Sequence, residues 1–250
     1  MKIPVSTNLW PPPGKLCLSL SGGKDSTCVA LLLKYLGIAP DMVLYVDSGW
    51  EWPEVADHLD KLESATWPIT RLSCDLPGLS RNHGWPTYHN RWCNSAKRKA
   101  LSDARKHLAN DYVEVIGIAA DEDKRVKHNP RRWYPLVAYD ITQDEALEIC
   151  YQAGYDFGGI YRSRSRLSCY CCPLQRWGEL QQIRLDRPDL WAEMQRCDDA
   201  MPQPSEFKGT TWAAAEARVD AMPKPRTVRV TTIETAVSRA RARFSDTVLV

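Results

Sequence analysis

The chain has 250 residues and nearly balanced charge, with 33 Lys and Arg against 31 Asp and Glu. Its hydrophobic content of 44% is enough for a substantial core, in one large domain or in one domain with an appendage. No apolar run approaches the roughly 20 residues that cross a bilayer, and residues 1–6 lack the apolar stretch of a signal peptide. The sequence therefore predicts a cytoplasmic protein without a membrane partner.

The nine cysteines are an odd number and are unevenly distributed. Cys169, Cys171 and Cys172 fall within four residues. Such a clustered, odd set fits reduced thiols and metal ligation better than the disulfide framework of a secreted protein. A reducing compartment is expected.

Strands and helices are expected to alternate through the first half of the chain. Apolar runs predict strands at residues 15–20, 42–46, 69–73 and 112–119, and helical spacing predicts helices at 27–36, 53–65 and 95–108. This alternation is typical of an α/β fold with a Rossmann-like, mostly parallel sheet that has helices on both faces. Ligands of such sheets bind at the carboxyl ends of the strands.

The second half is expected to be mostly helical. A charged loop at 121–135 precedes a helix at 142–153, where Thr142 and Glu145 have the spacing of a capping box. Further helices are expected near 177–185 and 188–200. The clustered cysteines precede these helices, and a proline-containing stretch follows them. We expect three parts: a nucleotide-binding α/β domain at 1–140, a helical cysteine-containing segment at 141–200 packed on it, and a linker with a basic tail at 201–250.

The loop at residues 21–27, which reads SGGKDST, joins the first strand to the first helix. It is not a Walker A sequence, because the first glycine of that motif would fall at Leu18 and Asp25 follows the lysine. Gly22 and Gly23 let backbone N–H groups approach an anion, the helix adds its N-terminal dipole, and Lys24 adds a mobile positive charge. The loop therefore predicts a phosphate cradle; a glycine-containing turn is the simpler alternative.

SGGKDS after an apolar strand resembles the PP-loop of the ATP-pyrophosphatase, or adenine nucleotide alpha-hydrolase-like, superfamily. Four further stretches resemble motifs of its phosphoadenosine-phosphosulfate-reductase-like branch: DSGWEWPE at 47–54, RWCN at 91–94, GIAADEDKR at 117–125 and SCYCCP at 168–173. The similarity covers about residues 15–200. It implies the adenine nucleotide alpha-hydrolase-like fold.

The resemblance also implies a reaction. In this superfamily the loop binds the pyrophosphate end of ATP with Mg²⁺, and a substrate oxygen attacks the α-phosphorus, which gives an adenylated substrate and pyrophosphate. Lys24, Asp25 and Asp47 would be catalytic, with Lys24 neutralising the leaving pyrophosphate. The nucleotide site would comprise Ser21, Gly22, Gly23, Lys24, Asp25, Ser26, Thr27, Asp47, Gly117, Glu122 and Arg125.

Three of these residues have simpler interpretations. Asp47 follows a predicted strand, where an aspartate often closes a turn. Glu122 and Arg125 lie in a charged loop and could equally be solvated. Their assignment to the nucleotide site therefore depends on the resemblance.

The clustered cysteines, together with Cys93, could bind a metal if the fold brings them together. Zinc would take four tetrahedral ligands, whereas an iron–sulfur cluster can be held by three or four cysteines. The resemblance favours a 4Fe-4S cluster on Cys93, Cys169 and Cys172, with Cys171 as the fourth ligand and Cys197 as a weaker candidate. Zinc and buried structural thiols are the alternatives, and with three ligands the open iron could carry a sulfide.

These features favour ATP-dependent adenylation coupled to sulfur transfer, with a nucleic acid as acceptor and a sulfur-donor protein as a further partner; a homo-oligomer is compatible with the sequence. The basic loop at 124–132 and the arginine-rich tail support a polyanionic substrate. The first alternative is a sulfonucleotide reductase, although that family's Glu-Cys-Gly-x-His segment is missing from this sequence. The second is a non-catalytic nucleotide-binding adaptor, which would release no pyrophosphate.

Overall fold

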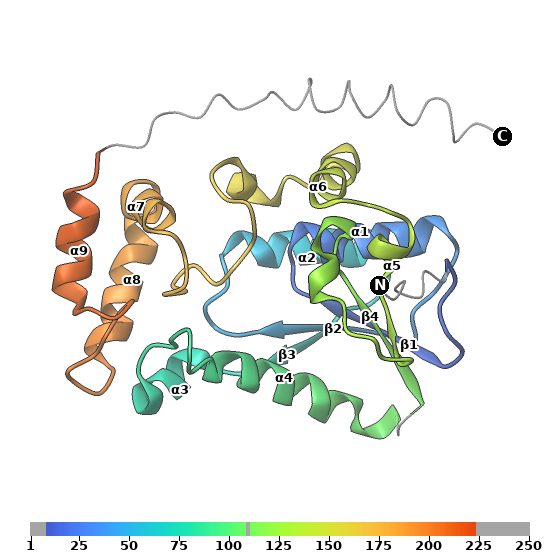
Figure 1. Cartoon of the computed structure of the whole chain (residues 1–250), viewed down its shortest axis with the longest axis horizontal. Helices are drawn as coiled ribbons and strands as arrows, with labels where there is room; N and C mark the ends of the chain where they lie inside the picture. The colour runs from blue at the N-terminus through green and yellow to red at the C-terminus, as the bar shows by residue number, and fades with distance from the viewer. Residues whose placement is uncertain (1–8, 109–110, 224–250) are drawn as a thin grey trace.

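The computed structural model describes residues 9–108 and 111–223. A five-stranded parallel sheet in the order β3-β2-β1-β4-β5 forms its centre (Figure 1). Leu18 in the central strand pairs in register with Val43 on one side and Val115 on the other. The strands are β1 (Lys15–Leu20), β2 (Met42–Asp47), β3 (Thr70–Ser73), β4 (Tyr112–Ile116) and β5 (Arg132–Trp133). The predicted parallel α/β fold is confirmed, and β5 is an additional short strand.

Helices cover both faces of this sheet (Figure 1). One face carries α1 (Lys24–Tyr35), α2 (Glu54–Ala65), α5 (Pro135–Ala138) and α6 (Gln143–Gln152), and the other carries α3 (Leu76–His83) and α4 (Trp92–Arg105). Because both faces are covered, the central strands are apolar on both sides, and Leu18 and Val115 are fully buried.

Local sequence signals explain several helix boundaries. The hydroxyl of Thr142 accepts the N–H of Glu145, and the carboxylate of Glu145 accepts the N–H of Thr142 at 2.9 Å, which confirms the predicted capping box. Helix α3, which contains a proline and a glycine, is an additional helix that was not among the predicted elements. It forms because Asp75 caps it through the N–H of Gly78 at 3.0 Å.

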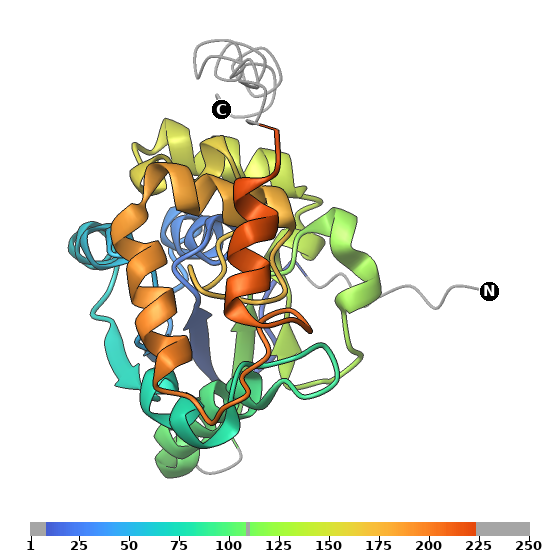
Figure 2. The same ribbon diagram turned by 90° about the vertical axis from the view of Figure 1, so that its left-hand side faces the viewer.

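The C-terminal helices gather at one end of the sheet, as Figure 2 shows. They are α7 (Trp177–Asp186), α8 (Pro188–Asp199) and α9 (Trp212–Asp220); short 3₁₀ helices occur at Lys106–Leu108, Ala120–Arg125 and Phe157–Arg162. The ring of Phe207 is buried and packs 5.0 Å from Trp85 and 5.3 Å from Trp212. Residues 201–223 are therefore packed with the helical part and do not form the expected linker.

The predicted basic tail at 224–250 lies outside the described residues. Within residues 9–108 and 111–223, no helix is long and apolar enough to cross a membrane.

Candidate functional site

The loop between β1 and α1 is held in shape by its own serines. The hydroxyl of Ser26 accepts the N–H of Ser21 and donates to the carbonyl of Gly23, both at 3.1 Å. Gly22 has a φ of +74°, and a β-carbon there would lie 2.9 Å from Val55, so only glycine fits this position. The sequence thus builds a tight loop that delivers the chain directly into α1.

This loop leaves backbone donors free at the start of α1. The first helical bond to the loop runs from the N–H of Thr27 to the carbonyl of Gly23 at 3.0 Å. Within the described part of the chain, the N–H groups of Asp25 and Ser26 have no hydrogen-bond acceptor. Free N–H groups at the N-terminus of a 12-residue helix attract an anion. The local geometry is therefore that of a phosphate cradle.

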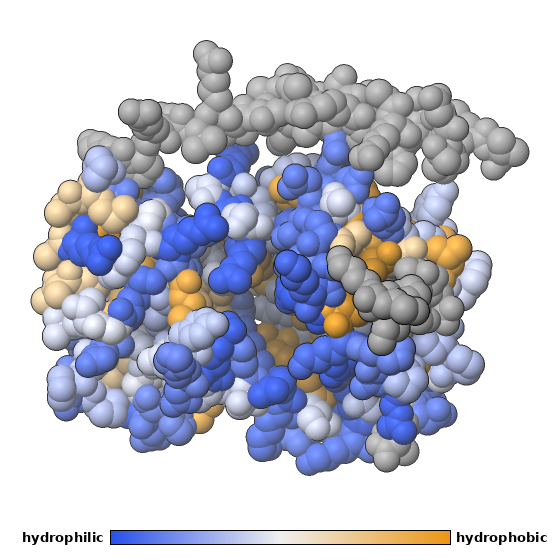
Figure 3. Space-filling model, in the orientation of Figure 1, coloured by the Kyte–Doolittle hydropathy of each residue, from blue (hydrophilic) through white to orange (hydrophobic). Residues whose placement is uncertain are grey.

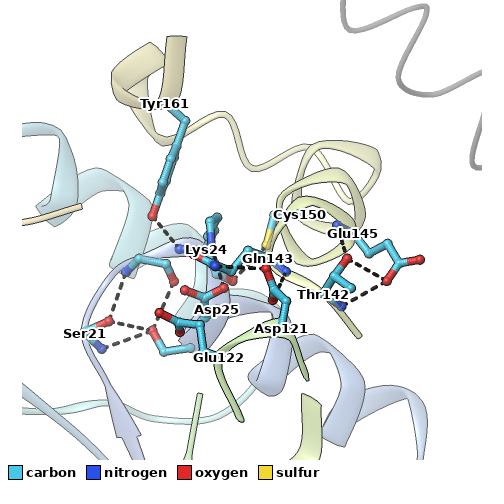
Figure 4. A network of polar contacts seen from close by, with 12 residues as sticks. Ser21, Lys24, Asp25, Asp121, Glu122, Thr142, Gln143, Glu145, Cys150 and Tyr161 are labelled. Carbon is cyan, nitrogen blue, oxygen red and sulfur yellow. Dashed lines mark hydrogen bonds and ion pairs between the residues drawn. The ribbon is translucent and has the colours of Figure 1, made fainter. Parts of the chain in front are cut away.

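The charged groups of the loop are largely buried. Lys24 is only 3% exposed, and its ammonium lies 2.7 Å from Oδ1 of Asp25. Burial raises the pKa of Asp25 despite this pairing, and the nearby carboxylate of Glu122 raises it further. Figure 4 shows Asp25 and Glu122 gathered beside Lys24. Two carboxylates and an ammonium around free N–H groups suit a Mg²⁺–polyphosphate ligand.

Tyr161 covers this loop from the other side (Figure 4). Its hydroxyl accepts the backbone N–H of Lys24 at 2.8 Å, and burial raises the pKa of the phenol. A β-carbon on Gly23 would lie 3.1 Å from this hydroxyl, so Gly23 gives Tyr161 access to the loop. Sequence analysis missed Tyr161 because it lies 137 residues from its partner.

Gly117 follows β4 and lies directly against the start of α1. A β-carbon there would lie 2.8 Å from the backbone nitrogen of Ser26 and 2.9 Å from the carbonyl carbon of Asp25. Strands β1 and β4 are neighbours at the point where the strand order reverses, which is where open α/β sheets bind ligands. Gly117 therefore permits the close approach that closes the back of the cradle.

The remaining predicted nucleotide residues are placed differently. Oδ1 of Asp47 accepts the N–H of Gly49 at 2.8 Å, which is the turn interaction considered above. Thr27 is buried and its hydroxyl lies 2.9 Å from Nε2 of His58, so its side chain faces the core. Glu122 pairs with Arg125 at 2.6 Å. The structure thus brings Glu122 to the loop, whereas Thr27 and Asp47 are engaged elsewhere.

The segment that carries Cys169, Cys171 and Cys172, here called the cysteine loop, crosses the end of β2. The N–H of Tyr170 donates to the carbonyl of Trp50 at 3.1 Å, which ties the loop to the turn after the strand. The amide of Gln175 donates to the carbonyls of Cys169, Tyr170 and Cys172 at 3.4, 2.7 and 3.2 Å. A single side chain therefore fixes the backbone that presents these thiols.

The four predicted metal ligands are not equivalent. Cys93, Cys169 and Cys172 are partly exposed, whereas Cys171 is fully buried. Burial is the main cause of the raised pKa of Cys93, and the charge of Cys172 raises it further. Cys171 lies in the core, where its neighbours include Cys197. Burial therefore separates Cys171 from the three predicted ligands that remain partly exposed.

The spacing of these thiols bears on the choice of metal. In the described residues, no three Cys, His, Asp or Glu side chains are arranged to hold a single metal ion. Tetrahedral zinc with Zn–S bonds of about 2.3 Å would need sulfurs about 3.8 Å apart. Thiolates that surround an iron–sulfur cluster stand further apart, because the cluster fills the space between them. Cys93, Cys169 and Cys172 supply three soft thiol donors, which an iron–sulfur cluster or, with one further ligand, zinc can take.

A charged network that sequence analysis missed adjoins the thiols. The ammonium of Lys97 lies 2.8 Å from Oε1 of Glu51 and 3.5 Å from Sγ of Cys169, and Ser48 donates to Glu51 at 2.6 Å. Burial opposes the charge on Lys97, but Cys169 and Glu51 outweigh it and raise its pKa. Burial raises the pKa of the Cys169 thiol to about 12, and the neighbouring Glu51 raises it further. The position of Lys97 one helical turn after Cys93 was the available signal.

Comparisons with known proteins assign the chain to a family. The family model for the phosphoadenosine phosphosulfate reductase domain matches residues 15–181. The uncharacterised protein MJ0066 of Methanocaldococcus jannaschii is 26% identical over 200 residues, which are 70% of this chain but only 39% of that relative, so the chain spans about two fifths of its length. The structure of the U34-tRNA thiolase NcsA from Methanococcus maripaludis, with its 4Fe-4S cluster, is similar with a TM-score of 0.42 and 17% identity, over 92% of this chain and 82% of that one. The family match includes the loop at 21–27 and the cysteine loop, and the chain belongs to the phosphoadenosine phosphosulfate reductase domain family.

Proposed function

We propose that this protein uses ATP at the loop of residues 21–27 to adenylate a nucleic acid, and then transfers sulfur to the activated position. The observation that carries this proposal is the pair of free N–H groups on Asp25 and Ser26 beside the buried ammonium of Lys24. Three positively polarised donors on neighbouring residues suit a polyphosphate. Membership of the family supports nucleotide chemistry at this loop.

The first step is substitution at phosphorus. An oxygen of the substrate attacks the α-phosphorus of ATP, the bond from that phosphorus to the bridging oxygen breaks, and pyrophosphate leaves with the electron pair. Lys24 would neutralise charge that develops on pyrophosphate. Asp25 and Glu122 would hold Mg²⁺, which when bound would neutralise the phosphates further.

The second step replaces oxygen by sulfur. A sulfide supplied by a donor protein attacks the activated carbon, the carbon–oxygen bond breaks, and AMP leaves with that oxygen. A 4Fe-4S cluster bound by Cys93, Cys169 and Cys172 would supply an open iron position for the sulfide. Leu167 supports the proximity of the two sites: it lies two residues before Cys169, and its Cβ would be 3.5 Å from a β-carbon on Gly23.

Pyrophosphate release tests the adenylation step. Lys24→Gln removes the positive charge but keeps a donor for Asp25, and Lys34→Gln, on the exposed last turn of the same helix, is the matched control. With ATP, Mg²⁺, sulfide and an RNA mixture, we expect Lys24→Gln to release pyrophosphate at least about 100-fold more slowly than wild type, and Lys34→Gln to match wild type. Equal rates for all three proteins would refute the proposal.

The same assay separates the competing functions. An adaptor would bind ATP but release no pyrophosphate with any nucleic acid. A sulfonucleotide reductase would release sulfite from phosphoadenosine phosphosulfate and a thiol reductant without ATP. The burial of Cys197, the last cysteine of the sequence, does not favour a reductase that uses it as nucleophile.

Metal analysis tests the sulfur site separately. Protein purified without oxygen should contain iron and acid-labile sulfide in equal amounts. Cys172→Ala should lose both, whereas Cys28→Ala, a core thiol in α1, should keep both. Zinc without iron, or full iron in Cys172→Ala, would exclude the proposed ligand set.

A further inference from the structure

A hollow of about 710 Å³ lies along one face of α4, away from the phosphate cradle. Most of the wall of this hollow comes from α4. The lining residues of α4 recur at intervals of three or four and therefore share one face of the helix. The lining residues are His89, Asn90, Arg91, Trp92, Asn94, Ser95, Lys97, Arg98 and Leu101. In Figure 3 the lower part of the visible face, which α3 and α4 occupy in Figure 1, is predominantly hydrophilic.

The hollow carries positive charge, and the part of it that comes from Arg91 and Arg98 is not paired with a carboxylate among the described residues. Its lining includes two arginines, a lysine and a histidine but no carboxylate. In the described part of the chain, the guanidinium of Arg98 has one hydrogen bond, to the hydroxyl of Ser95 at 3.3 Å, and neither Arg98 nor Arg91 has an ion pair. Both arginines are exposed. Such a surface fits a polyanion.

A second basic stripe, formed by Lys99 of α4 and Lys106 of the 3₁₀ turn that follows it, provides a contrast. Lys99 and Lys106 are 78% and 74% exposed, and both pair with Asp103 at 2.6 Å. Lys99 follows Arg98 by one residue, so its side chain is rotated by about 100° around the helix axis from that of Arg98. Its charge is partly neutralised, and it lies outside the hollow.

The hollow leads to the cysteine site through Lys97. This residue lines the hollow, and its ammonium is the group that contacts Cys169 and Glu51. Cys93 stands between two lining residues, Trp92 and Asn94. A chain that lies in the hollow would therefore present its bases near the thiols.

We propose that this hollow binds a single-stranded nucleic acid, with Arg91 and Arg98 on its phosphates and Tyr88 beneath a base. The two arginines are seven residues apart, or about 10 Å along the helix, so they can follow a backbone. Tyr88 is 75% exposed, its ring lies 5.4 Å from the ring of His89, which lines the hollow, and it offers a surface for stacking. Because the thiols and Lys97 are partly buried, a base must leave a duplex to reach them.

This inference rests on the proposed function and names how that site takes its acceptor. Fluorescence anisotropy with labelled single strands of about 15 nucleotides, as RNA and as DNA, tests it against the duplex of the same sequence. The variant is Arg91→Ala/Arg98→Ala, and the matched control is Lys99→Ala/Lys106→Ala, which removes the same charge from the neighbouring stripe. Thermal melting of both variants checks that they fold.

We expect the arginine variant to bind single strands at least about tenfold more weakly, and the salt dependence of its log affinity to decrease by about 1.4 for two lost phosphate contacts. The lysine variant should change affinity less than about twofold. Equal losses in both variants would overturn the proposal, because the binding would then follow net charge alone. A duplex that binds as tightly as a single strand would also overturn it.

Two further results separate this proposal from the proposed function. If wild type releases pyrophosphate with a nucleic acid but the arginine variant binds that nucleic acid normally, the proposed binding in the hollow is wrong and the proposed function stands. If wild type binds single strands through the arginines but releases no pyrophosphate, the function is wrong and the hollow stands. If 3′-phosphoadenosine binds as tightly as the oligonucleotides, the hollow is a mononucleotide site and the proposal is refuted.

Discussion

Replacing Gly117 by alanine would insert a methyl group between β4 and the start of α1. Gly117 is not among the described glycines with positive φ, so alanine can adopt its backbone conformation. The obstacle is steric: the new carbon would lie 2.8 Å from the backbone nitrogen of Ser26 and 2.9 Å from the carbonyl carbon of Asp25. Since these are backbone atoms, no side-chain rotation can relieve the contact.

The expected magnitude follows from this contact. Normal separation requires the loop to move by about half an ångström, and such overpacking costs about 1–3 kcal/mol of unfolding free energy. The melting temperature of a domain of this size falls by about 2–4 °C for each kcal/mol. Displacing the phosphate donors by this distance should weaken ATP binding roughly tenfold, since larger misplacements near 1 Å cost about 100-fold.

Calorimetric melting and ATP titration check both effects. Gly178→Ala is the matched control, because no atom lies within 4 Å of the added carbon and the residue is in the first turn of α7. The control should keep or slightly increase stability, by up to about 1 kcal/mol, and should bind ATP as wild type does. Wild-type melting and ATP affinity in Gly117→Ala would refute the steric argument.

Two other contacts give predictions of their own. Burial lowers the pKa of His58 to about 4, below its unfolded value near 6.5. As the pH falls, the unfolded state therefore binds a proton on His58 before the folded state does. Urea unfolding should find full stability above about pH 6.5 and a loss of up to about 3 kcal/mol of unfolding free energy by pH 4. The His58→Gln variant should lose less unfolding free energy over this range. Tyr161→Phe leaves the N–H of Lys24 without its acceptor, which should cost about 1–2 kcal/mol in the absence of ligand. ATP should raise the melting temperature of this variant more than that of wild type, because a phosphate oxygen can accept the same N–H; a smaller rise would show that the hydroxyl assists ATP binding.

Local signals were sufficient for much of the fold. The period of apolar residues predicted the strands β1, β2, β3 and β4 and their order along the chain. The capping box at Thr142 and Glu145 predicted the start of α6. The glycines of the loop predicted its position between β1 and α1. These features depend on interactions within a few residues, which the sequence states directly. Strand β5 was not predicted, because a strand of two residues is too short to show an alternation of apolar and polar positions.

The candidate site depends on contacts that the sequence leaves unstated. Tyr161 reaches Lys24 across 137 residues, and Lys97 reaches Cys169 across 72 residues, so neither partner can be chosen from spacing. Cys171 and Cys172 are adjacent in sequence, yet packing buries the first completely and leaves the second partly exposed. The sequence by itself determined which chemical groups are present and which elements carry them. Only tertiary packing decided which groups meet and which are withdrawn from solvent, because burial and long-range contact are properties of the folded chain as a whole.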